Sequence, residues 1–345
     1  MIKYCISTAV GVFLLCSVCS CGDQHSSFTL KQVCSIADTT GNPLACYAPD
    51  GTLYIAGAQG IWSLRLTDAG KMQVDMAEWP KSLDIYEGSQ GPGLLSFRWG
   101  KNGLVLGSQR LKAEADINYW GDDNERVAVA LFSKANNTVI LRQLPLPKEV
   151  RLIGSQHAIG DTIVAYEPES DTILHYDEHG VHTSSGVLKA ETGLSLSAML
   201  VADAAEVDCK NVWLLSITDE RAIGLDQFSG RLYVFRHDFT VEYMLDSPEY
   251  IVRRIQESRN TWRPYLWSPS AFGTQVCQVL PNESGGFALA IWKVGIQSVS
   301  SSYTPLRLET NVSHCAVALR SPSRGAVVAA AKEGLLVYEF QLPLE

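Results

Sequence analysis

The sequence lacks the clustered positive charge that several large classes of protein require. Its 345 residues include 28 Lys and Arg against 37 Asp and Glu, which gives a formal net charge of −9, and no basic block stands out. Binding to nucleic acid needs a concentrated basic face, and adhesion to anionic lipid headgroups through charge needs clustered Lys and Arg. The overall composition therefore argues against both, and no nucleic-acid partner is expected.

The common signatures of catalysis are also missing. The chain has no GxSxG nucleophile elbow, no HExxH zinc motif and no phosphate-binding P-loop, and it lacks the Ser-x-Asp-x-Gly-x-x-Trp box of sialidases. We therefore predict that the chain is not an enzyme, with no catalytic residue and no cofactor. Carboxylates from different repeats could still meet at one mouth of the fold, so a glycan-acting hydrolase or lyase is the alternative.

No apolar run near the N-terminus is long enough to span a membrane. Lys3 is the only charged residue before Asp23, and the apolar run between them covers residues 9–15. A spanning helix needs about 20 apolar residues. This short run behind a positive start therefore predicts a signal peptide over residues 1–20.

The end of this segment resembles the lipobox at which bacterial lipoproteins are cleaved and acylated. Val18 and Ser20 fit the positions three residues and one residue before the acceptor Cys21, whereas Cys19 stands where Ala, Ser or Thr is usual, as in the relaxed lipoboxes of spirochaetes. We predict an acyl (palmitate-type) anchor at Cys21 and a flexible, lipidated tether over residues 21–30. Cleavage with release, and an uncleaved anchor, are the alternatives.

The cysteines beyond the export segment do not form a disulfide framework. They are odd in number and widely dispersed, and none lies in a CxxC pair that could hold zinc: Cys34, Cys46, Cys209, Cys277 and Cys315. Most of them lie next to the first apolar strand of a repeat, which predicts small buried packing positions. A disulfide between Cys34 and Cys46, or a reactive thiol, is the alternative.

Two segments near opposite ends of the chain share one pattern. Residues 49–66 read PDGTLYIAGAQGIWSLRL, and residues 323–342 read SRGAVVAAAKEGLLVYEFQL. Each has a turn with glycine, an apolar strand, a second turn ending in glycine and another apolar strand. Glycine at such turns is typical of tight β-hairpins, which need positive φ.

Weaker copies lie between these two segments, in residues 99–111, 159–183, 209–245 and 283–299. The strands after the opening turns begin near residues 52, 103, 162, 212, 286 and 326, which gives spacings of about 40 to 75 residues, near the length of a propeller blade with insertions. Short strands with few helical patterns exclude a parallel α/β sheet. Ring closure buries both faces of each sheet and protects the edges.

We therefore predict an all-β fold, a β-propeller of six blades over residues 31–345, or seven if residues 112–158 contain another blade. The likeness between the first and last units suggests that an N-terminal strand completes the last blade. The unit at 49–66 resembles the blade consensus of two-component-regulator and other sensor-type β-propellers, DGxLWxGTxxGL, with matches at Gly51, Leu53, Tyr54, Gly57 and Gly60. A lipid-anchored bacterial propeller is also similar, at the level of fold, to the outer-membrane assembly lipoprotein BamB.

Two insertions interrupt the repeats. Residues 112–126 are acidic, and residues 246–274 contain the one clear helix candidate, which Ser247 can cap. Beyond this helix lie four residues of the types enriched at interface hot spots: Trp262, Arg263, Tyr265 and Trp267. We predict that these four residues bind a protein partner, with packing against the chain's own blade as the alternative.

Metal-binding patterns are weak. His175 and Asp177 alternate along an expected strand and could share a face with His179 across a turn. Exposed polar residues of a hairpin are the favoured interpretation, and the same holds for the acidic residues 122–125, which lack the spacing of a calcium loop. No metal site is therefore predicted.

Together these features predict a non-enzymatic lipoprotein of the bacterial cell envelope, at the periplasmic face of a membrane or at the cell surface. The bilayer would be one partner, through acylated Cys21, and a protein of the envelope the other. A small-ligand sensor module is the further alternative. The lack of a spanning segment after the tether means that such a sensor would signal through another protein.

Overall fold

The computed structural model describes the repeats and most of the two ends of the expected domain. It covers residues 28–38, 43–67 and 71–79, the strands between 94 and 245 together with Val181, and residues 246, 249, 253, 270–282, 286–295, 299–308 and 312–343. The predicted signal peptide and Cys21 lie outside the described residues. No helix in the described part of the chain is long and apolar enough to cross a membrane.

The described residues form six antiparallel sheets of four strands each. The first sheet contains β2 (Leu44–Tyr47), β3 (Leu53–Ala56), β4 (Gly60–Leu66) and β5 (Met72–Glu78). The second contains β6 (Leu94–Trp99), β7 (Leu104–Ser108), β8 (Arg126–Ser133) and β9 (Thr138–Gln143). The third contains β10 (Arg151–Leu152), β11 (Ile163–Glu167), β12 (Thr172–Tyr176) and β13 (His182–Val187).

The remaining sheets follow the same order. The fourth contains β14 (Val212–Ile217), β15 (Arg221–Asp226), β16 (Leu232–Arg236) and β17 (Val241–Leu245). The fifth contains β18 (Ser270–Phe272), β19 (Gln275–Pro281), β20 (Phe287–Val294) and β21 (Val299–Leu306). The last, here called the closing sheet, contains β22 (His314–Ser321), β23 (Arg324–Ala331), β24 (Gly334–Gln341) and β1 (Thr29–Ile36).

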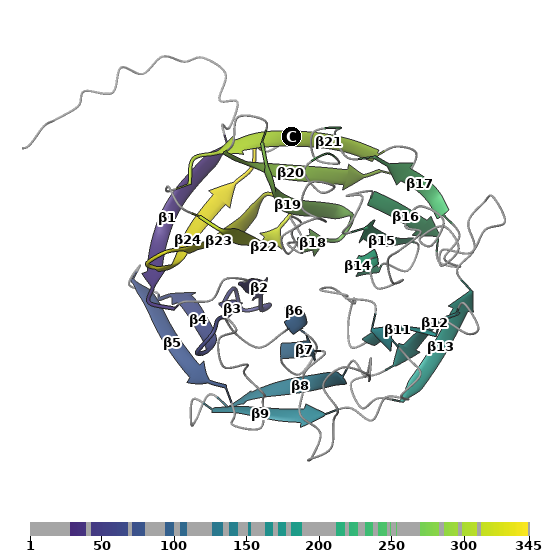
Figure 1. Cartoon of the computed structure of the whole chain (residues 1–345), viewed down its shortest axis with the longest axis horizontal. Helices are drawn as coiled ribbons and strands as arrows, with labels where there is room; N and C mark the ends of the chain where they lie inside the picture. The colour runs from purple at the N-terminus through teal and green to yellow at the C-terminus, as the bar shows by residue number, and fades with distance from the viewer. Residues whose placement is uncertain are drawn as a thin grey trace, which may run out of the picture.

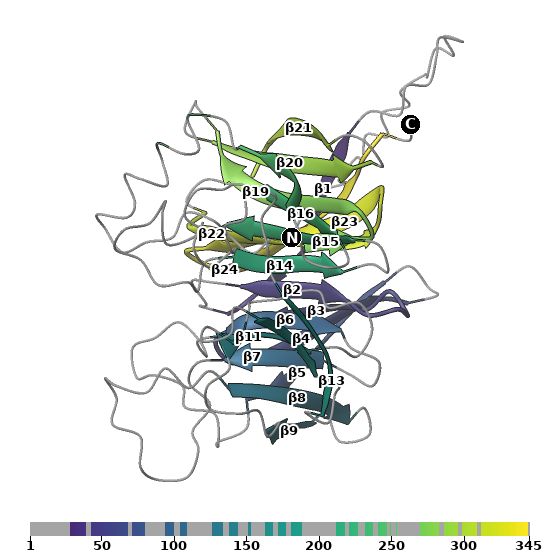
Figure 2. The ribbon, with the colours of Figure 1, turned by 90° about the vertical axis from the view of Figure 1, so that its right-hand side faces the viewer.

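These sheets stand around a central axis (Figure 1). The first strands, such as β2, β6, β14, β18 and β22, lie nearest the axis, and the fourth strands, such as β5, β9 and β21, lie at the rim. Seen from the side, the strands run through the thickness of the ring between its two faces (Figure 2). The predicted all-β fold of repeated antiparallel units is confirmed.

The closing sheet joins the two ends of the described chain. Strand β1 pairs with β24 in antiparallel register from Thr29↔Gln341 to Ile36↔Leu335, with one irregularity between Gln32 and Cys34. Phe28, just before the strand, stacks on Phe340 with ring centroids 6.5 Å apart. This pairing is the closure by an N-terminal strand that the sequence predicted. Thr29 and Leu30, which the sequence assigned to the flexible tether, are therefore part of β1.

The repeats predicted from the sequence fall once in each sheet, but not at equivalent strands. The matched segments 49–66 and 323–342 form β3–β4 and β23–β24, which are the second and third strands of neighbouring sheets. The four strands expected within 209–245 are β14 to β17. By contrast, the repeat start predicted near residue 212 falls at β14, the first strand of the fourth sheet, and the one near residue 286 falls just before β20, the third strand of the fifth sheet. The sequence did not distinguish these positions because the turns and apolar runs of different strands look alike.

The core lies between neighbouring sheets. Ile55 and Leu64 of the first sheet pack with Ala316, Val328 and Val337 of the closing sheet, and the side chain of Ile55 is fully buried. Similar clusters join the first sheet to the second, the fourth to the fifth and the fifth to the closing sheet. Each large aliphatic side chain buried in this way contributes about 1.5–3 kcal/mol.

A buried carboxylate fastens the closing sheet to the first sheet. Asp38, just after β1, is 1% exposed. It accepts hydrogen bonds from the backbone N–H of Ala58 (2.9 Å) and Gln59 (3.3 Å) and from Trp62 Nε1 (2.7 Å). Gly57 leaves the space for it, since a Cβ there would collide with the carboxylate. Charge-assisted bonds of this kind stabilise more than neutral ones.

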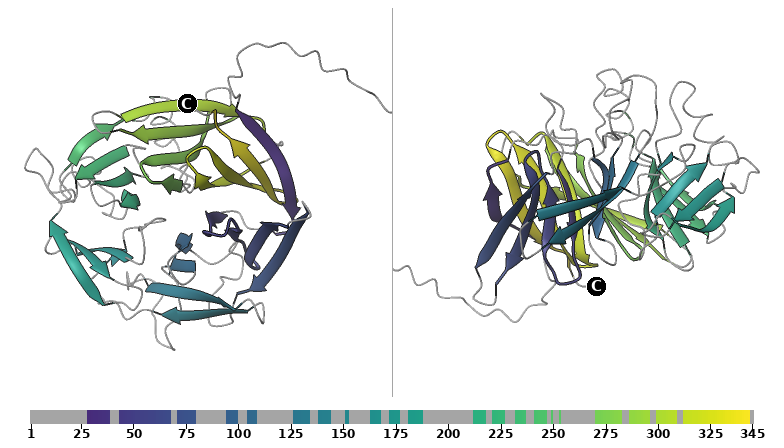
Figure 3. Two further views of the ribbon diagram at one scale, coloured as in Figure 1. Left: turned by 180° about the vertical axis from the view of Figure 1, so that it is seen from behind. Right: turned by 90° about the horizontal axis from the view of Figure 1, so that it is seen from below.

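The alternation of strand direction gives the ring two distinct faces. The face called terminal here carries the start of β1 and the end of β24, together with the turns 48–52 and 322–323. The opposite face, called the connection face, carries Asp38 and the links that lead from the rim of one sheet to the axis of the next. The closing and first sheets lie side by side in both views of Figure 3, where the C-terminus is marked.

The two predicted insertions enter and leave on the connection face. Residues 109–125 join second strand β7 to third strand β8, and residues 246–269 join rim strand β17 to axial strand β18. Glu249 and Arg253, the described residues inside the expected helix, are helical. Strand β18 begins at Ser270, within the segment 246–274 that the sequence assigned to the insertion.

Replacement of Asp38 by Asn is expected to lower the free energy of unfolding by about 2 kcal/mol, because the lost charge weakens the three hydrogen bonds that this buried side chain accepts. Urea unfolding of the purified chain measures this change. Asp75→Asn is the matched control, since Asp75 is exposed on β5 and its carboxylate accepts a hydrogen bond from the exposed Gln73 side chain. An unchanged midpoint for Asp38→Asn would show that the carboxylate does not fasten the two sheets.

Candidate functional site

The residues predicted as sites from the sequence fall mostly outside the described part of the chain. This is true of Cys21, of the partner-binding residues Trp262, Arg263, Tyr265 and Trp267, and of Asp177 and His179. His175 lies in β12, where its backbone pairs with Val164 and Ser184. Within the described residues, no group of three or more His, Cys, Asp or Glu could hold a metal ion.

Three of the four cysteines that the structure describes are buried packing residues. Cys46, Cys277 and Cys315 are buried and unpaired, as predicted, and Cys34 is a partly exposed free thiol. The alternative disulfide between Cys34 and Cys46 is therefore wrong. Burial raises the pKa of all four thiols, that of Cys277 to about 12, with a smaller opposing effect of the Gln275 side chain there.

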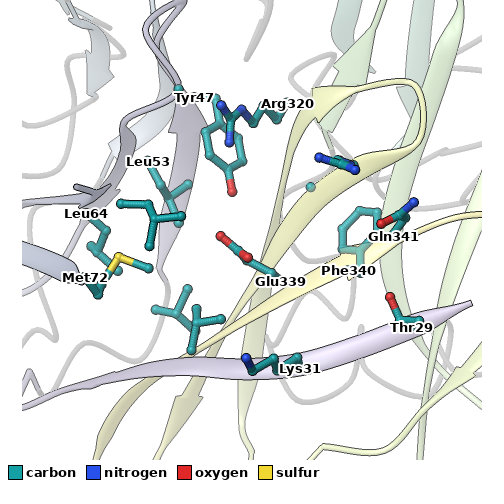
Figure 4. Close-up of a pocket in the computed structure, with 16 residues that line it drawn as sticks. Thr29, Lys31, Tyr47, Leu53, Leu64, Met72, Arg320, Glu339, Phe340 and Gln341 are labelled. Carbon is teal, nitrogen blue, oxygen red and sulfur yellow. The ribbon is translucent and has the colours of Figure 1, made fainter. Parts of the chain in front are cut away.

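A cleft opens between the closing sheet and the first sheet on the terminal face. Its volume is about 360 Å³, within the range of small-ligand sites. Strands β1 and β24 form one wall, and β3, β4 and the start of β5 form the other. Tyr47 at the end of β2 and Arg320 near the end of β22 close the side towards the axis (Figure 4). The two sheets are thus joined by the hydrogen bonds of Asp38 at the connection face, and the space between them is open at the terminal face.

Polar side chains meet at the centre of this cleft. The Tyr47 hydroxyl and the Glu339 carboxylate point towards one another, and Arg320 lies beside the tyrosine ring (Figure 4). Burial raises the pKa of Tyr47, the nearby Glu339 carboxylate raises it further, and Arg320 opposes the shift. Tyr47 therefore stays protonated at neutral pH and offers a hydrogen-bond donor to whatever enters.

The turn between β2 and β3 positions Arg320. Gly51 has a φ of 83°, a conformation that glycine adopts without strain, and its N–H donates to the Ala48 carbonyl (2.9 Å). A Cβ at Gly51 would lie 2.6 Å from Arg320 Nη2. The glycine therefore lets the guanidinium lie flat against the turn.

The rest of the lining divides into a charged rim and an apolar wall. Lys31, Arg320, Arg324 and Glu339 are exposed at the rim. The apolar wall combines buried Leu53 and Leu64 with partly buried Met72, and Leu66 at the mouth is 61% exposed. Such an arrangement suits a ligand with a charged group at one end and an apolar part at the other.

Sequence reasoning missed this cleft. Its charged residues come from both ends of the chain. They lie in or beside strands whose apolar residues predict a packed sheet and give no sign of a binding site. Gly51 and the closure of the ring were recognised, but only the register of β1 on β24 places Lys31 opposite Glu339.

Comparison with known proteins finds similar solved structures but no family. No protein-family description matches the chain, and neither does any curated protein sequence. Similar solved structures include a streptogramin B lyase, 13% identical over 93% of this chain and 100% of the other (TM-score 0.45), and the virginiamycin B lyase of Staphylococcus aureus, 9% identical over 92% and 100% (TM-score 0.45). A third is the PQQ-bound aldose sugar dehydrogenase of Streptomyces coelicolor, 10% identical over 92% and 99% (TM-score 0.48).

These structures are β-propeller proteins, and they correct one prediction. The prediction that the chain is not an enzyme is contradicted, because a lyase and a dehydrogenase are among the proteins built in this way. At identities of 13% or less, neither activity is assigned to this chain.

Replacement of Gly51 by Ala is expected to lower the free energy of unfolding by about 1–2 kcal/mol, mainly through backbone strain at a φ of 83° and to a smaller extent through displacement of the exposed Arg320 side chain. Gly273→Ala is the matched control, because Gly273 also has positive φ (57°) but a Cβ there meets nothing within 4 Å; it should cost about 1 kcal/mol. Combining Gly51→Ala with Arg320→Ala in urea unfolding should recover part of the difference. Equal losses for the two glycine variants would contradict the contact.

Proposed function

We propose that the chain is a binding protein of the bacterial cell envelope, built as a six-bladed β-propeller and tethered to a membrane through acylated Cys21. Its terminal face would be turned to the membrane, and its connection face would bind a protein partner. The observation that carries this proposal is topological. The start of β1 lies on one face, and both long insertions leave from the other.

The tether limits how far the ring can stand from the bilayer. Strand β1 is held by β24 from Thr29 onward. The seven residue steps from Cys21 to Phe28 reach about 25 Å at full extension. An acyl anchor at Cys21 would therefore keep the terminal face near the headgroups, since each buried methylene of the acyl chains stabilises attachment by about 0.8 kcal/mol.

The distribution of exposed apolar side chains supports this orientation. Of the five large hydrophobic residues exposed in the described part of the chain, four lie at or near the terminal face: Leu66 (61%), Val181 (58%), Phe272 (44%) and Val74 (38%). Met244 lies near the other face. Apolar residues on a face close to a bilayer can insert among headgroups, whereas on a face turned to water they gain nothing.

The partner surface is proposed on the segment between β17 and β18. This segment contains Trp262, Arg263, Tyr265 and Trp267, which combine large apolar area with directional hydrogen-bonding groups. Because its ends attach on the connection face, a partner bound there would not compete with the membrane for the same surface.

Replacement of Cys21 by Ser is expected to abolish incorporation of a palmitate analogue and to release the protein from the membrane fraction, because serine lacks the acceptor thiol. Cys34→Ser is the control and should label as the wild type does.

In the same cells, the Trp262→Ala/Trp267→Ala variant should lose, by tenfold or more, an envelope protein that co-purifies with the wild type.

Glu333→Ala is the control for partner binding, because Glu333 is exposed on a turn of the connection face outside the segment. It should retain the partner. Equal palmitate labelling of wild type and Cys21→Ser would contradict the anchor, and identical co-purifying proteins for wild type and the double tryptophan variant would contradict the partner surface.

A further inference from the structure

The cleft between the closing sheet and the first sheet has a local charge opposite to that of the chain. Its rim carries three cationic side chains, Lys31, Arg320 and Arg324, and one carboxylate, Glu339. The whole chain has a net charge of −9. Among the described residues, the Arg320 guanidinium and the Glu339 carboxylate form no hydrogen bond and no ion pair within 4 Å. An incoming anion would therefore not have to displace any of these residues from the guanidinium.

Arg320 lies where a ligand in the cleft can reach it. Its guanidinium lies against Gly51, where a side chain would displace it, and beside the ring of Tyr47 (Figure 4). A planar guanidinium in this position can form paired hydrogen bonds to the oxygens of a phosphate or carboxylate. The protonated Tyr47 hydroxyl adds a further donor at the same end of the cleft.

The apolar wall begins where the charged rim ends. Leu53 and Leu64 line its base, and Leu66 extends it outward with 61% of its side chain exposed. A ligand that is only an anion would leave this wall unused, and a hydrocarbon alone would leave the cations unpaired. The lining is complementary to an amphiphile with an acidic head.

The position of the cleft indicates where such an amphiphile would come from. Thr29, the first residue of β1, lines the cleft, so the cleft lies beside the point where the tether enters. This step rests on the proposed function, because it requires that the terminal face meets a bilayer.

We propose that the cleft between the closing sheet and the first sheet binds the headgroup of an anionic phospholipid from the membrane to which the chain is tethered. The phosphate is held by Arg320 and Arg324, with Lys31 at the rim. The upper part of an acyl chain lies along Leu64, Leu66 and Met72. Binding orients the ring on the bilayer in addition to the tether at Cys21.

The test uses the full-length Cys21→Ser chain, so that acyl chains on the protein cannot attach it to lipid. The chain should float with phosphatidylglycerol vesicles and not with phosphatidylcholine vesicles. Arg320→Gln/Arg324→Gln should weaken binding to phosphatidylglycerol about tenfold or more. Glu339→Gln should strengthen it severalfold, because the carboxylate repels the phosphate.

Arg236→Gln is the matched control, since Arg236 is an exposed cation at the end of β16 on the same face but outside the cleft. It should bind as the parent chain does, and unchanged urea midpoints should show that all the variants are folded. Equal binding to the two kinds of vesicle, or equal losses for Arg236→Gln and the cleft variant, would overturn the proposal. Weaker binding by Glu339→Gln would also overturn it, because removal of a negative charge beside a bound phosphate cannot weaken its attraction to the cations.

A soluble probe, dodecyl phosphate, distinguishes a free amphiphile from a lipid of the bilayer as the ligand. If dodecyl phosphate binds to the cleft but phosphatidylglycerol vesicles do not, the ligand is a free amphiphile and the bilayer proposal is wrong. Failure of the proposed function can be told apart from failure of this inference. In the first case the wild type would carry no palmitate label at Cys21, while the cleft would still bind vesicles.

Discussion

The pairing of β1 with β24 is the interaction on which the rest of this molecule depends. Without it the closing sheet would have three strands, and the rim edge of β24 would expose unpaired backbone groups. With it, strands from the two ends of the chain share one sheet, and Asp38 at the end of β1 can reach the turn between β3 and β4. Closure therefore fixes the contact between the first and last sheets as well as the ring itself.

The same pairing produces the proposed site. Because β1 runs from the terminal face to the connection face, it carries Lys31 into the open end of the wedge and Asp38 to the fastened end. Buried residues such as Ile55, Val328 and Val337 fill the space between these ends. The register of one strand thus determines both the cleft and the contact of Asp38 on the opposite face.

The strands and the closure could be predicted from the sequence because turns and alternation are local signals. The turns and apolar runs of residues 209–245 predicted all four strands of one sheet, and the likeness of 49–66 to 323–342 suggested that an N-terminal strand completes the last sheet. The cleft could not be predicted, because Lys31, Tyr47, Arg320 and Glu339 are far apart in sequence and meet only through register. Gly51 was recognised as a turn residue, while its second role beside Arg320 depends on a neighbouring sheet.

Hydrogen exchange in the full-length protein tests the central claim most directly. If β1 closes the ring, the amides of residues 29–36 should be protected to a degree similar to those of residues 334–341, because both strands open only when the closing sheet opens. Exchange of residues 29–36 at the rate of an unstructured chain, with residues 314–331 still protected, would contradict the closure and the placement of the cleft that follows from it.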